Sequence, residues 1–414
     1  MLEIPCWSIF ETALESDGDC LNPLTDTPIV LELESPSGRQ LRVHAFWDGG
    51  RTWRARFSPD EAGEWRWAWS GAGRSHSARR GAFHCVPYHG DNPLYLHGAV
   101  RRSADRRHLA HADGTPFFWL ADTAWNGVLR ARGTDWTRYL QTRRAQGFSA
   151  IQFVLTQWRG CRLDPLGETA FSVEADRLRI NPAFFQRMDP KVAMVNANGL
   201  VAAPVLLWAL IDSDPGLALP EELAVRLARY LVARYGAYQV VWFLAGDGDY
   251  RLERAERWKR IGSAVFADRH DRLVTMHPTG MHWVAGEFRN EPWYDFIGYQ
   301  SGHGDSDPGA PGRWHVLGPP ANDWATEPVL PVINLEPNYE AHISYDSANR
   351  FTDLEVRRAT WWSCLNAPTA GVSYGHHAIW PWAEQPGPVD GHPSVGPAPT
   401  CRGPRPWKRR VCEA

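Results

Sequence analysis

The sequence predicts a (β/α)8 (TIM) barrel preceded by a small antiparallel β-sandwich. Short runs with a period of two, separated by turn residues, fill the chain up to residue 88, and eight buried-strand runs then alternate with helical patterns. A polar or aromatic residue stands at the end of each of these eight runs. At 414 residues the chain is long enough for a barrel of about 250 residues and a smaller domain. We therefore expect a sandwich over 1–88, a barrel over 89–384 and a disordered, Pro- and Gly-rich tail over 385–414.

The period-two runs of the first part are 29–33, 41–46, 52–57 and 64–69. The segments PSG, DGG and SPDEAGEW lie between them and are typical of hairpin turns. Short strands at this spacing predict a sandwich. Because no cluster of acids or histidines occurs in this part, its expected role is to pack against the next domain.

The eight barrel strands are expected at 117–121, 148–156, 200–208, 240–246, 272–276, 296–299, 329–335 and 371–374. Mostly apolar runs of this kind are typical of parallel strands buried on both faces. Helical patterns lie among them at 134–147, 191–199, 220–235, 251–267 and 353–365. Thr134 is placed to cap the first of these helices and Gly147 to stop it. The pattern over 220–235 is the clearest, because it has Pro at its start, acids in its first turn and leucines on one face.

The residues at the strand ends are chemically distinctive. They are Asp122, Gln157, Trp208, Asp247, His277, Gln300 and Glu336, with Tyr374 and His376 at the last strand. In a barrel these positions converge on one mouth, where barrel enzymes keep their chemistry. Neither G-x-G-x-x-G nor G-x-x-x-x-G-K-[ST] follows the first strand, so nothing in the sequence supports nucleotide binding.

Two of these residues are carboxylates suited to glycoside hydrolysis. Asp247 follows the run VVWFLAG, where glycines permit a sharp exit from the strand, and Glu336 follows VLPVINL. One acid can protonate the leaving oxygen while the other attacks the anomeric carbon or activates water. Asp249 could replace Asp247 as the acid or join it in binding a cation. Glu340 could hydrogen-bond the substrate or a loop.

The other residues near the strand ends are candidate sugar ligands. We expect hydrogen bonds to sugar hydroxyls from Asp122, Gln157, His277, Gln300, Glu340, Tyr374 and His376. The 22 tryptophans offer flat faces to sugar rings, although most of them should lie in the core. The candidates for stacking are Trp125, Trp208 and Trp380.

Composition limits the partners and the compartment. A net charge of −3 and a pI near 6.6 give no reason to expect nucleic acid or an anionic membrane. The seven cysteines are scattered and form no CxxC pair, which argues against a disulfide framework or a structural zinc site. The chain begins MLEIPCWSIFE and contains no run of ~18 apolar residues, so we expect a soluble, cytoplasmic protein unless a signal peptide precedes this start.

Two other functions stay open at this point. His277, His303 and His376 could ligate a metal in a metal-dependent hydrolase, but their spacing is not a ligand motif, and we expect neither a metal nor another cofactor. A carbohydrate-binding protein without activity would need the acids to be lost, whereas both are present.

Several motifs, in order along the chain, resemble a known family. WSIFE, FWDGG, TWRARFSP and GEWRW resemble the immunoglobulin-like domain that precedes apiosidase-like glycoside hydrolases, and DGTPFFWLADTAW, VVWFLAGD, NLEPNYE and YGHHAIW resemble their catalytic barrel. The resemblance covers residues 1 to 384 and implies a retaining glycosidase acting on plant cell-wall (pectic) side chains, such as those bearing apiose. It assigns the acid/base to Asp247 and the nucleophile to Glu336. Retention in turn implies carboxyl groups about 5 to 5.5 Å apart.

The chain departs from the family pattern in two places. Ala245 replaces the first of two glycines before Asp247, which is a small change. After Trp380, where the family would continue with a last barrel helix and a β domain, the sequence contains many prolines and no apolar period of 3.6. We therefore expect exposed outer faces on the first and eighth strands. We also expect a truncated or frame-shifted enzyme that is poorly soluble or inactive alone.

Overall fold

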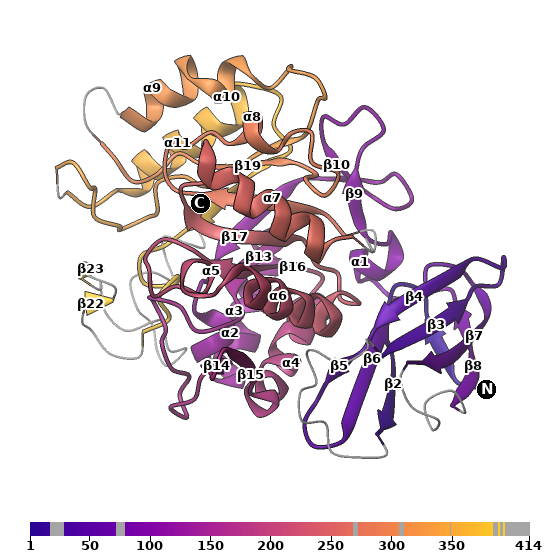
Figure 1. Ribbon diagram of the computed structural model, residues 1–414. Coiled ribbons are helices and arrows are strands. Elements are labelled where there is room, and N and C mark those ends of the chain that lie inside the picture. The colour runs from indigo at the N-terminus through magenta and orange to yellow at the C-terminus, as the bar shows by residue number, and fades with distance from the viewer. Residues whose placement is uncertain are drawn as a thin grey trace.

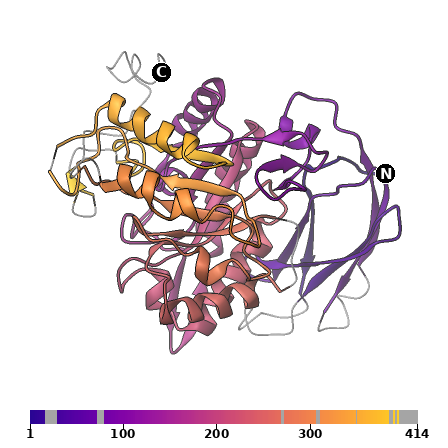
Figure 2. The same ribbon diagram turned by 90° about the horizontal axis from the view of Figure 1, so that it is seen from above.

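Residues 1–16, 29–71, 79–267, 272–305, 310–347, 349–383, 388–389 and 392–393 are described in the computed structural model of the protein. Two parts are visible, a group of β-sheets at the N-terminus, drawn in indigo, and a larger α/β body (Figure 1). Seen from above, the sheets lie on the side of the body away from the orange and yellow helices (Figure 2).

The N-terminal part is a sandwich of two antiparallel-rich sheets. One sheet has the order β1 (Glu3–Pro5), β8 (Arg80–Val86), β7 (Gly63–Ser70), β3 (Val30–Glu34) and β4 (Gln40–His44). The other has the order β2 (Phe10–Glu15), β6 (Thr52–Phe57) and β5 (Phe46–Trp47). Their inner faces share one core, which includes Phe10, Leu31, Trp53, Trp65 and Phe83. The period-two pattern therefore predicted this part correctly, because alternate residues of each strand face that core.

The body is an eight-stranded parallel barrel. Its strands are β12 (Trp119–Thr123), β13 (Ala150–Val154), β16 (Val201–Trp208), β17 (Trp242–Gly248), β18 (Val274–Pro278), β19 (Ile297–Gln300), β20 (Val332–Glu336) and β21 (Gly371–Gly375). They are hydrogen-bonded in the order β18-β17-β16-β13-β12-β21-β20-β19. The two end strands of this order approach each other through the Thr275 hydroxyl, which accepts from the Gly298 N–H at 3.1 Å and donates to the Phe296 carbonyl at 2.7 Å. The predicted fold class, a barrel after a small β domain, is confirmed.

The long helices lie outside the barrel. They are α3 (Gly133–Ala145), α4 (Pro182–Ala197), α6 (Glu221–Tyr235), α7 (Glu253–Val265), α9 (Ala310–Leu317) and α11 (Asp353–Leu365). Thr134 was expected to cap α3 but lies inside it, and Arg132 precedes the helix without a side-chain cap. The pattern at 191–199 proves to be the end of α4, which begins after an Asn181 side-chain cap. No helix among the described residues is both long and apolar enough to cross a membrane.

The smaller elements lie between these. The helices are α1 (Pro93–Leu96), α2 (Gly127–Arg130), α5 (Pro215–Ala218), α8 (Ala285–Phe288) and α10 (Pro319–Asn322). The strands are β9 (Val100–Arg102), β10 (Leu109–His111) and β11 (Pro116–Phe117) in one sheet, and the hairpin β14 (Phe171–Glu174) with β15 (Arg177–Ile180).

The expected exposure of the first and eighth strands is wrong. Four of the five residues in each of β12 and β21 are buried. Tyr139 and Arg143 of α3 cover this side, and Trp382 packs edge-on against Tyr139 at 5.2 Å and Trp136 at 5.6 Å. Aromatic side chains thus cover the surface for which the sequence predicts no helix. In the predicted tail, β22 (Pro388–Val389) pairs with β23 (His392–Pro393), and the rest of 385–414 lies outside the described residues.

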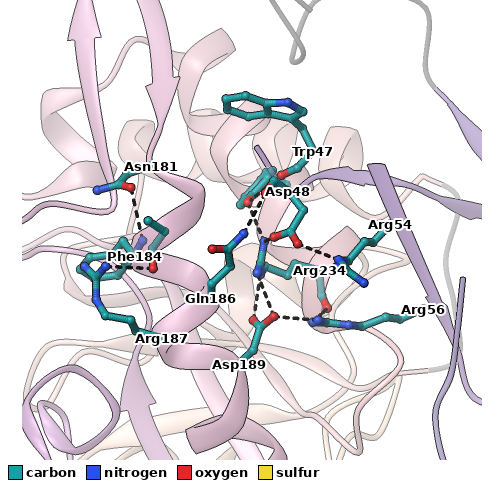
Figure 3. Close-up of polar contacts among 12 residues, drawn as sticks. Trp47, Asp48, Arg54, Arg56, Asn181, Phe184, Gln186, Arg187, Asp189 and Arg234 are labelled. Atoms are coloured by element: carbon teal, nitrogen blue, oxygen red, sulfur yellow. Dashed lines mark hydrogen bonds and ion pairs between the residues drawn. The ribbon is translucent and has the colours of Figure 1, made fainter. Parts of the chain in front are cut away.

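A buried ion-pair network joins the sandwich to the barrel (Figure 3). Arg234 of α6 is fully buried and donates from Nε and Nη2 to the two carboxylate oxygens of Asp189 in α4, both at 2.8 Å. From the sandwich, Arg56 of β6 donates to the same Asp189 at 2.7 Å. Asp48, which follows β5, pairs with Arg234 at 2.9 Å and with Arg54 at 2.7 Å. Each part therefore supplies a charge that the other part neutralises.

The substitution Asp189→Asn is expected to destabilise the protein by about 3 to 5 kcal/mol, because two buried guanidinium groups lose their shared counter-charge. Burial alone would raise the pKa of Asp189, but Arg234 and Arg56 hold it below its usual range. Its contribution to stability is therefore present above the pKa of ~4 of an unfolded Asp and is lost as the pH falls through the lower, folded value.

Urea unfolding followed by tryptophan fluorescence measures this effect. The matched control is Glu222→Gln in α6, which removes an exposed pair with Arg226 and is expected to change stability by less than about 1 kcal/mol. Equal unfolding midpoints for the two variants would show that the network does not stabilise the fold.

Candidate active site

Asp247 lies at the end of β17 in a conformation that few non-glycine residues adopt. Its φ is +51°, in the left-handed region. The flanking glycines have no room for a Cβ, because one at Gly246 would stand 2.6 Å from the Trp208 ring and one at Gly248 would stand 2.8 Å from the Ala209 carbonyl oxygen. The strand end can therefore lie against β16 while the chain turns at Asp247. Backbone strain of this kind is concentrated at functional sites.

Glu336, the last residue of β20, is buried between two imidazoles. His303 Nε2 lies 2.8 Å from its Oε1, and His277 Nε2 lies 3.4 Å from its Oε2. The Tyr339 N–H donates to His303 Nδ1 at 3.3 Å, so a neutral His303 carries its proton on Nε2 and donates it to Glu336. Burial would raise the pKa of Glu336, but the adjacent His277 and His303 imidazoles hold it well below its usual range. This carboxylate is therefore ionised at neutral pH.

The carboxyl group of Asp247 shifts in the opposite direction. Burial raises its pKa, and the negative charge of Glu336 raises it further. Arg159 Nη2, 3.2 Å from Asp247 Oδ2, and the imidazoles of His277 and His303 oppose this rise without reversing it. Acid-assisted substitution needs one carboxyl group that donates a proton and a second that is ionised. The pKa shifts of Asp247 and Glu336 suit these two roles.

Asp249, the alternative acid, has a different environment. Its carboxylate accepts hydrogen bonds from Arg251 at 2.9 Å and Arg254 at 2.5 Å, and it lies 3.4 Å from His282. The hydrogen bond from Arg251 is the main cause that lowers the pKa of Asp249 to about 2. Asp249 is thus a stable anion, which favours Asp247 as the proton donor.

Two of the predicted stacking residues line the same place. The Trp125 ring meets Trp208 at 5.1 Å and His277 at 5.2 Å, edge-on in both cases. Trp208 also meets Trp158 at 4.3 Å, and the Arg159 guanidinium lies over both of those rings. Trp208 Nε1 is buried and has no hydrogen-bond partner among the described residues, so it is available to a sugar hydroxyl.

Gln300, Trp380 and His376 come from the neighbouring strands. Gln300 is buried and pairs in register with Glu336 at the ends of β19 and β20. The Trp380 ring lies 6.5 Å from Trp158. His376 Nδ1 accepts a backbone N–H of its own loop at 3.0 Å, and burial lowers its pKa to about 4, so the ring is neutral. Gln300 thus lies next to Glu336, Trp380 lies further out beside Trp158, and His376 fixes a loop.

Asp122 does not reach the mouth. Its carboxylate is fully buried between β12 and α3, where it accepts hydrogen bonds from Tyr139 at 2.6 Å and from Arg143 at 2.5 Å. Side chains alternate along a strand, and the next residue, Thr123, is the one that points into the barrel and accepts from Gln152 at 3.0 Å. Asp122 therefore holds a helix to the sheet in place of contacting a sugar.

Tyr374, Glu340 and Gln157 also bond within the protein. The Tyr374 hydroxyl donates to Glu340 at 2.6 Å, with the Arg143 guanidinium 5.5 Å from its ring. Both residues thus belong to the outer side of β21. The Gln157 side chain donates to the Phe171 carbonyl at 2.8 Å and accepts a hydrogen bond from the Ala170 N–H at 3.0 Å, and these bonds hold the β14–β15 hairpin. The structure does not bring these three side chains to the two carboxylates.

The sequence does not predict two residues of the site, and it predicts a different role for a third. Arg159 and Tyr339 were not predicted, although Tyr339 lies in the NLEPNYE motif that contains Glu336. His303 was considered only as a possible metal ligand. In the structure it bonds the carboxylate, and the described residues contain no group of three or more His, Cys, Asp or Glu that could hold a metal ion.

Comparison with known proteins places this arrangement in context. The family model described as "Apiosidase-like, catalytic domain" matches residues 103–411, and a model of a domain of unknown function, DUF5060, matches residues 3–71. No curated protein sequence matches the chain.

Solved structures share the fold. A candidate glycoside hydrolase from Bacteroides vulgatus is 21% identical, with a TM-score of 0.75 over 99% of this chain and 77% of its own. A glycoside hydrolase of family 5 from the same species is 25% identical, with a TM-score of 0.62 over 75% of this chain and 68% of its own. An endo-1,4-beta-mannanase from Rhizomucor miehei is 12% identical, with a TM-score of 0.52 over 67% and 90%.

Proposed function

The chain belongs to the apiosidase-like glycoside hydrolases, and from this premise we propose that it cleaves an O-glycosidic bond with retention at the anomeric carbon, using Asp247 as acid/base and Glu336 as nucleophile. The observation that carries the proposal is geometric: Glu336 at the end of β20 lies between the imidazoles of His303 and His277, and Asp247 near the end of β17 is hydrogen-bonded to Arg159. These surroundings shift the pKa values of the two carboxyl groups in opposite directions. Asp247 holds its proton to a higher pH than an ordinary Asp while Glu336 stays ionised, and the first step of a retaining mechanism requires this order.

In the first step, Asp247 gives its proton to the glycosidic oxygen while a Glu336 oxygen forms a bond to the anomeric carbon. The bond from that carbon to the leaving oxygen breaks, and a glycosyl ester on Glu336 results. Ionised Asp247 then takes a proton from water, whose oxygen attacks the same carbon and releases Glu336. Each step inverts the carbon once, so the product keeps the configuration of the substrate.

The surrounding residues fit this sequence of steps. His303 holds one Glu336 oxygen through a 2.8 Å hydrogen bond, which positions the other for attack. Trp208 lies against Gly246, the residue before the acid, and Trp125 packs on Trp208. Gln300 and Trp208 Nε1 supply polar groups for sugar hydroxyls. We assign these residues to substrate binding together with His277 and Trp380.

The test is product configuration on a panel of glycosides, including pectic oligosaccharides, followed by proton NMR from the first minutes of reaction. We expect the first-formed product to have the anomeric configuration of the substrate. A product of opposite configuration would indicate carboxyl groups ~6.5 to 9.5 Å apart with a water between them, and would overturn the assignment of Glu336 as nucleophile. The same panel tests the predicted preference for pectic side chains.

A further inference from the structure

Two cysteine sulfur atoms lie side by side in the N-terminal sandwich. The Sγ atoms of Cys6 and Cys85 are 2.9 Å apart, although the two residues are 79 positions apart in the chain. Cys85 belongs to β8 and is fully buried, whereas Cys6 follows β1 and is half-buried. A disulfide bond is about 2.05 Å long, so the two sulfur atoms need to approach by only about 0.9 Å to reach bonding distance.

The backbone holds the two cysteines in this position. β1 pairs in parallel with β8, with Ile4 opposite Cys85, and the Cys6 N–H continues the ladder by donating to the Val86 carbonyl at 2.8 Å. Trp7 then turns the chain with a φ of +65°, in the left-handed region. The two thiols therefore lie on paired segments of neighbouring strands, and rotation of the side chains brings them together without a change in the fold.

The segment after Cys6 connects the sandwich to the barrel. The Trp7 carbonyl accepts a hydrogen bond from the Gln239 side chain at 3.0 Å, and a Cβ at Gly98 would stand 2.5 Å from the Trp7 indole. The strand that positions this segment, β1, has only three residues and lies at the edge of its sheet. Few hydrogen bonds hold such a strand, so a covalent bond to β8 would stabilise both the strand and the interface.

The two thiols differ in reactivity. Burial, together with the neighbouring Cys6 thiol, raises the pKa of Cys85 above its usual range, so Cys85 is a protonated thiol at neutral pH. Cys6 is partly open to solvent and thus to small reagents. An oxidant consequently reacts with Cys6 first, and Cys85 is placed to complete the bond.

We infer that Cys6 and Cys85 form a disulfide bond when the protein meets a small-molecule disulfide such as oxidised glutathione. The Cys6 thiolate attacks one glutathione sulfur, and a mixed disulfide and one glutathione thiolate result. Cys85 then gives up its proton and attacks the Cys6 sulfur, which releases the second glutathione thiolate. Two protein thiols are oxidised, one glutathione disulfide is reduced, and the two thiol protons pass to the two glutathione products.

This inference is independent of the proposed function. It concerns a single bridge and not the disulfide framework that the scattered cysteines argue against. In a reducing compartment the pair stays as two thiols, and in an oxidising one it becomes a bond between β1 and β8.

Peptide mapping tests the bond directly. The reduced full chain is incubated with excess oxidised glutathione, its remaining thiols are blocked, and the protein is digested after glutamate and arginine. This digestion places Cys6 in residues 4–11, Cys85 in residues 81–101 and Cys20, which lies outside the described residues, in a third peptide. We expect peptide 4–11 to be linked to peptide 81–101, and the link to disappear after treatment with dithiothreitol.

Thermal unfolding of the same samples gives a second measure. The bond closes a loop that spans 79 positions and so restricts the unfolded chain. We therefore expect the unfolding midpoint of the oxidised wild type to exceed that of the reduced wild type by about 5 °C or more. Cys6→Ser should abolish the shift. The matched control is Cys364→Ser, which changes a half-buried cysteine on the barrel helix α11 and should retain it.

Three results would overturn the inference. Peptides 4–11 and 81–101 might be recovered separately, as blocked thiols or glutathione adducts, or either of them linked to Cys20 in place of its partner. The midpoint might also rise equally in the wild type and in Cys6→Ser, which would assign the effect to other cysteines. Because the oxidised and reduced wild type are compared with each other, the test does not depend on the stability of a variant.

Discussion

Replacing Glu336 by Gln is expected to reduce turnover by at least ~10⁴-fold, because removal of a nucleophile leaves only the binding and electrostatic parts of catalysis. The amide has the shape of the carboxylate, and its oxygen can still accept the hydrogen bond from His303 Nε2. Sugar binding should therefore change little. Initial rates give the loss in kcat, and calorimetry on the inactive variant gives the affinity.

The matched control for this variant is Glu340→Gln, four residues further along the chain. Glu340 accepts a hydrogen bond from Tyr374 on the outer side of β21, so we expect its loss to cost less than about tenfold in turnover, by relaxation of the loop alone. Full activity in Glu336→Gln would transfer the nucleophile to another acid, and equal losses in the two variants would indicate structural damage.

The barrel could be predicted from the sequence because a strand buried on both faces must be apolar along its whole length. Runs such as 200–208 and 240–246 have no other common explanation when helical patterns separate them. The same reasoning placed Asp247 and Glu336 at the mouth. Glu336 is the last residue of β20, and Asp247 is the last but one of β17, where a φ of +51° takes the backbone out of the extended conformation and breaks the alternation of side chains along the strand.

The direction of a side chain inside a strand could not be predicted. The sequence predicts Asp122 and Tyr374 at strand ends, but β12 and β21 continue through them, and each side chain points outward toward α3. A displacement of one residue moves a side chain to the other face of the sheet, and a single sequence does not fix the strand end that closely. The neighbour of Asp122 that points inward is Thr123, and nothing in the sequence singles out this threonine as a residue of the barrel interior.

Contacts between distant loops were equally out of reach. Arg159 meets Asp247 across 88 residues of chain, and His303 meets Glu336 across 33. No local spacing links an arginine to one strand end or a histidine to another, since only closure of the barrel brings them together. The electrostatic asymmetry of the two acids thus belongs to the fold and not to any motif.

Replacing Asp247 by Ala should produce a loss that depends on the leaving group. For an alkyl glycoside, whose leaving oxygen needs a proton, we expect a fall in kcat/KM of ~10²- to 10⁴-fold, the usual contribution of a general acid. For a dinitrophenyl glycoside, which leaves without a proton, the first step should be nearly unaffected. Added azide should then restore turnover and yield a glycosyl azide of retained configuration, since it attacks the glycosyl ester without needing a base.

The pH profile supplies an independent measure of the same role. Asp247 must be protonated in the first step, and burial and Glu336 raise its pKa, so wild-type kcat/KM should fall as the pH rises through that raised value. With the dinitrophenyl substrate, Asp247→Ala should lose this basic limb. The control is Asp249→Ala. This variant removes a carboxylate that has a pKa of about 2 and is ionised throughout, so the basic limb should persist. A basic limb that survives in Asp247→Ala and disappears in Asp249→Ala would assign the proton to the second aspartate.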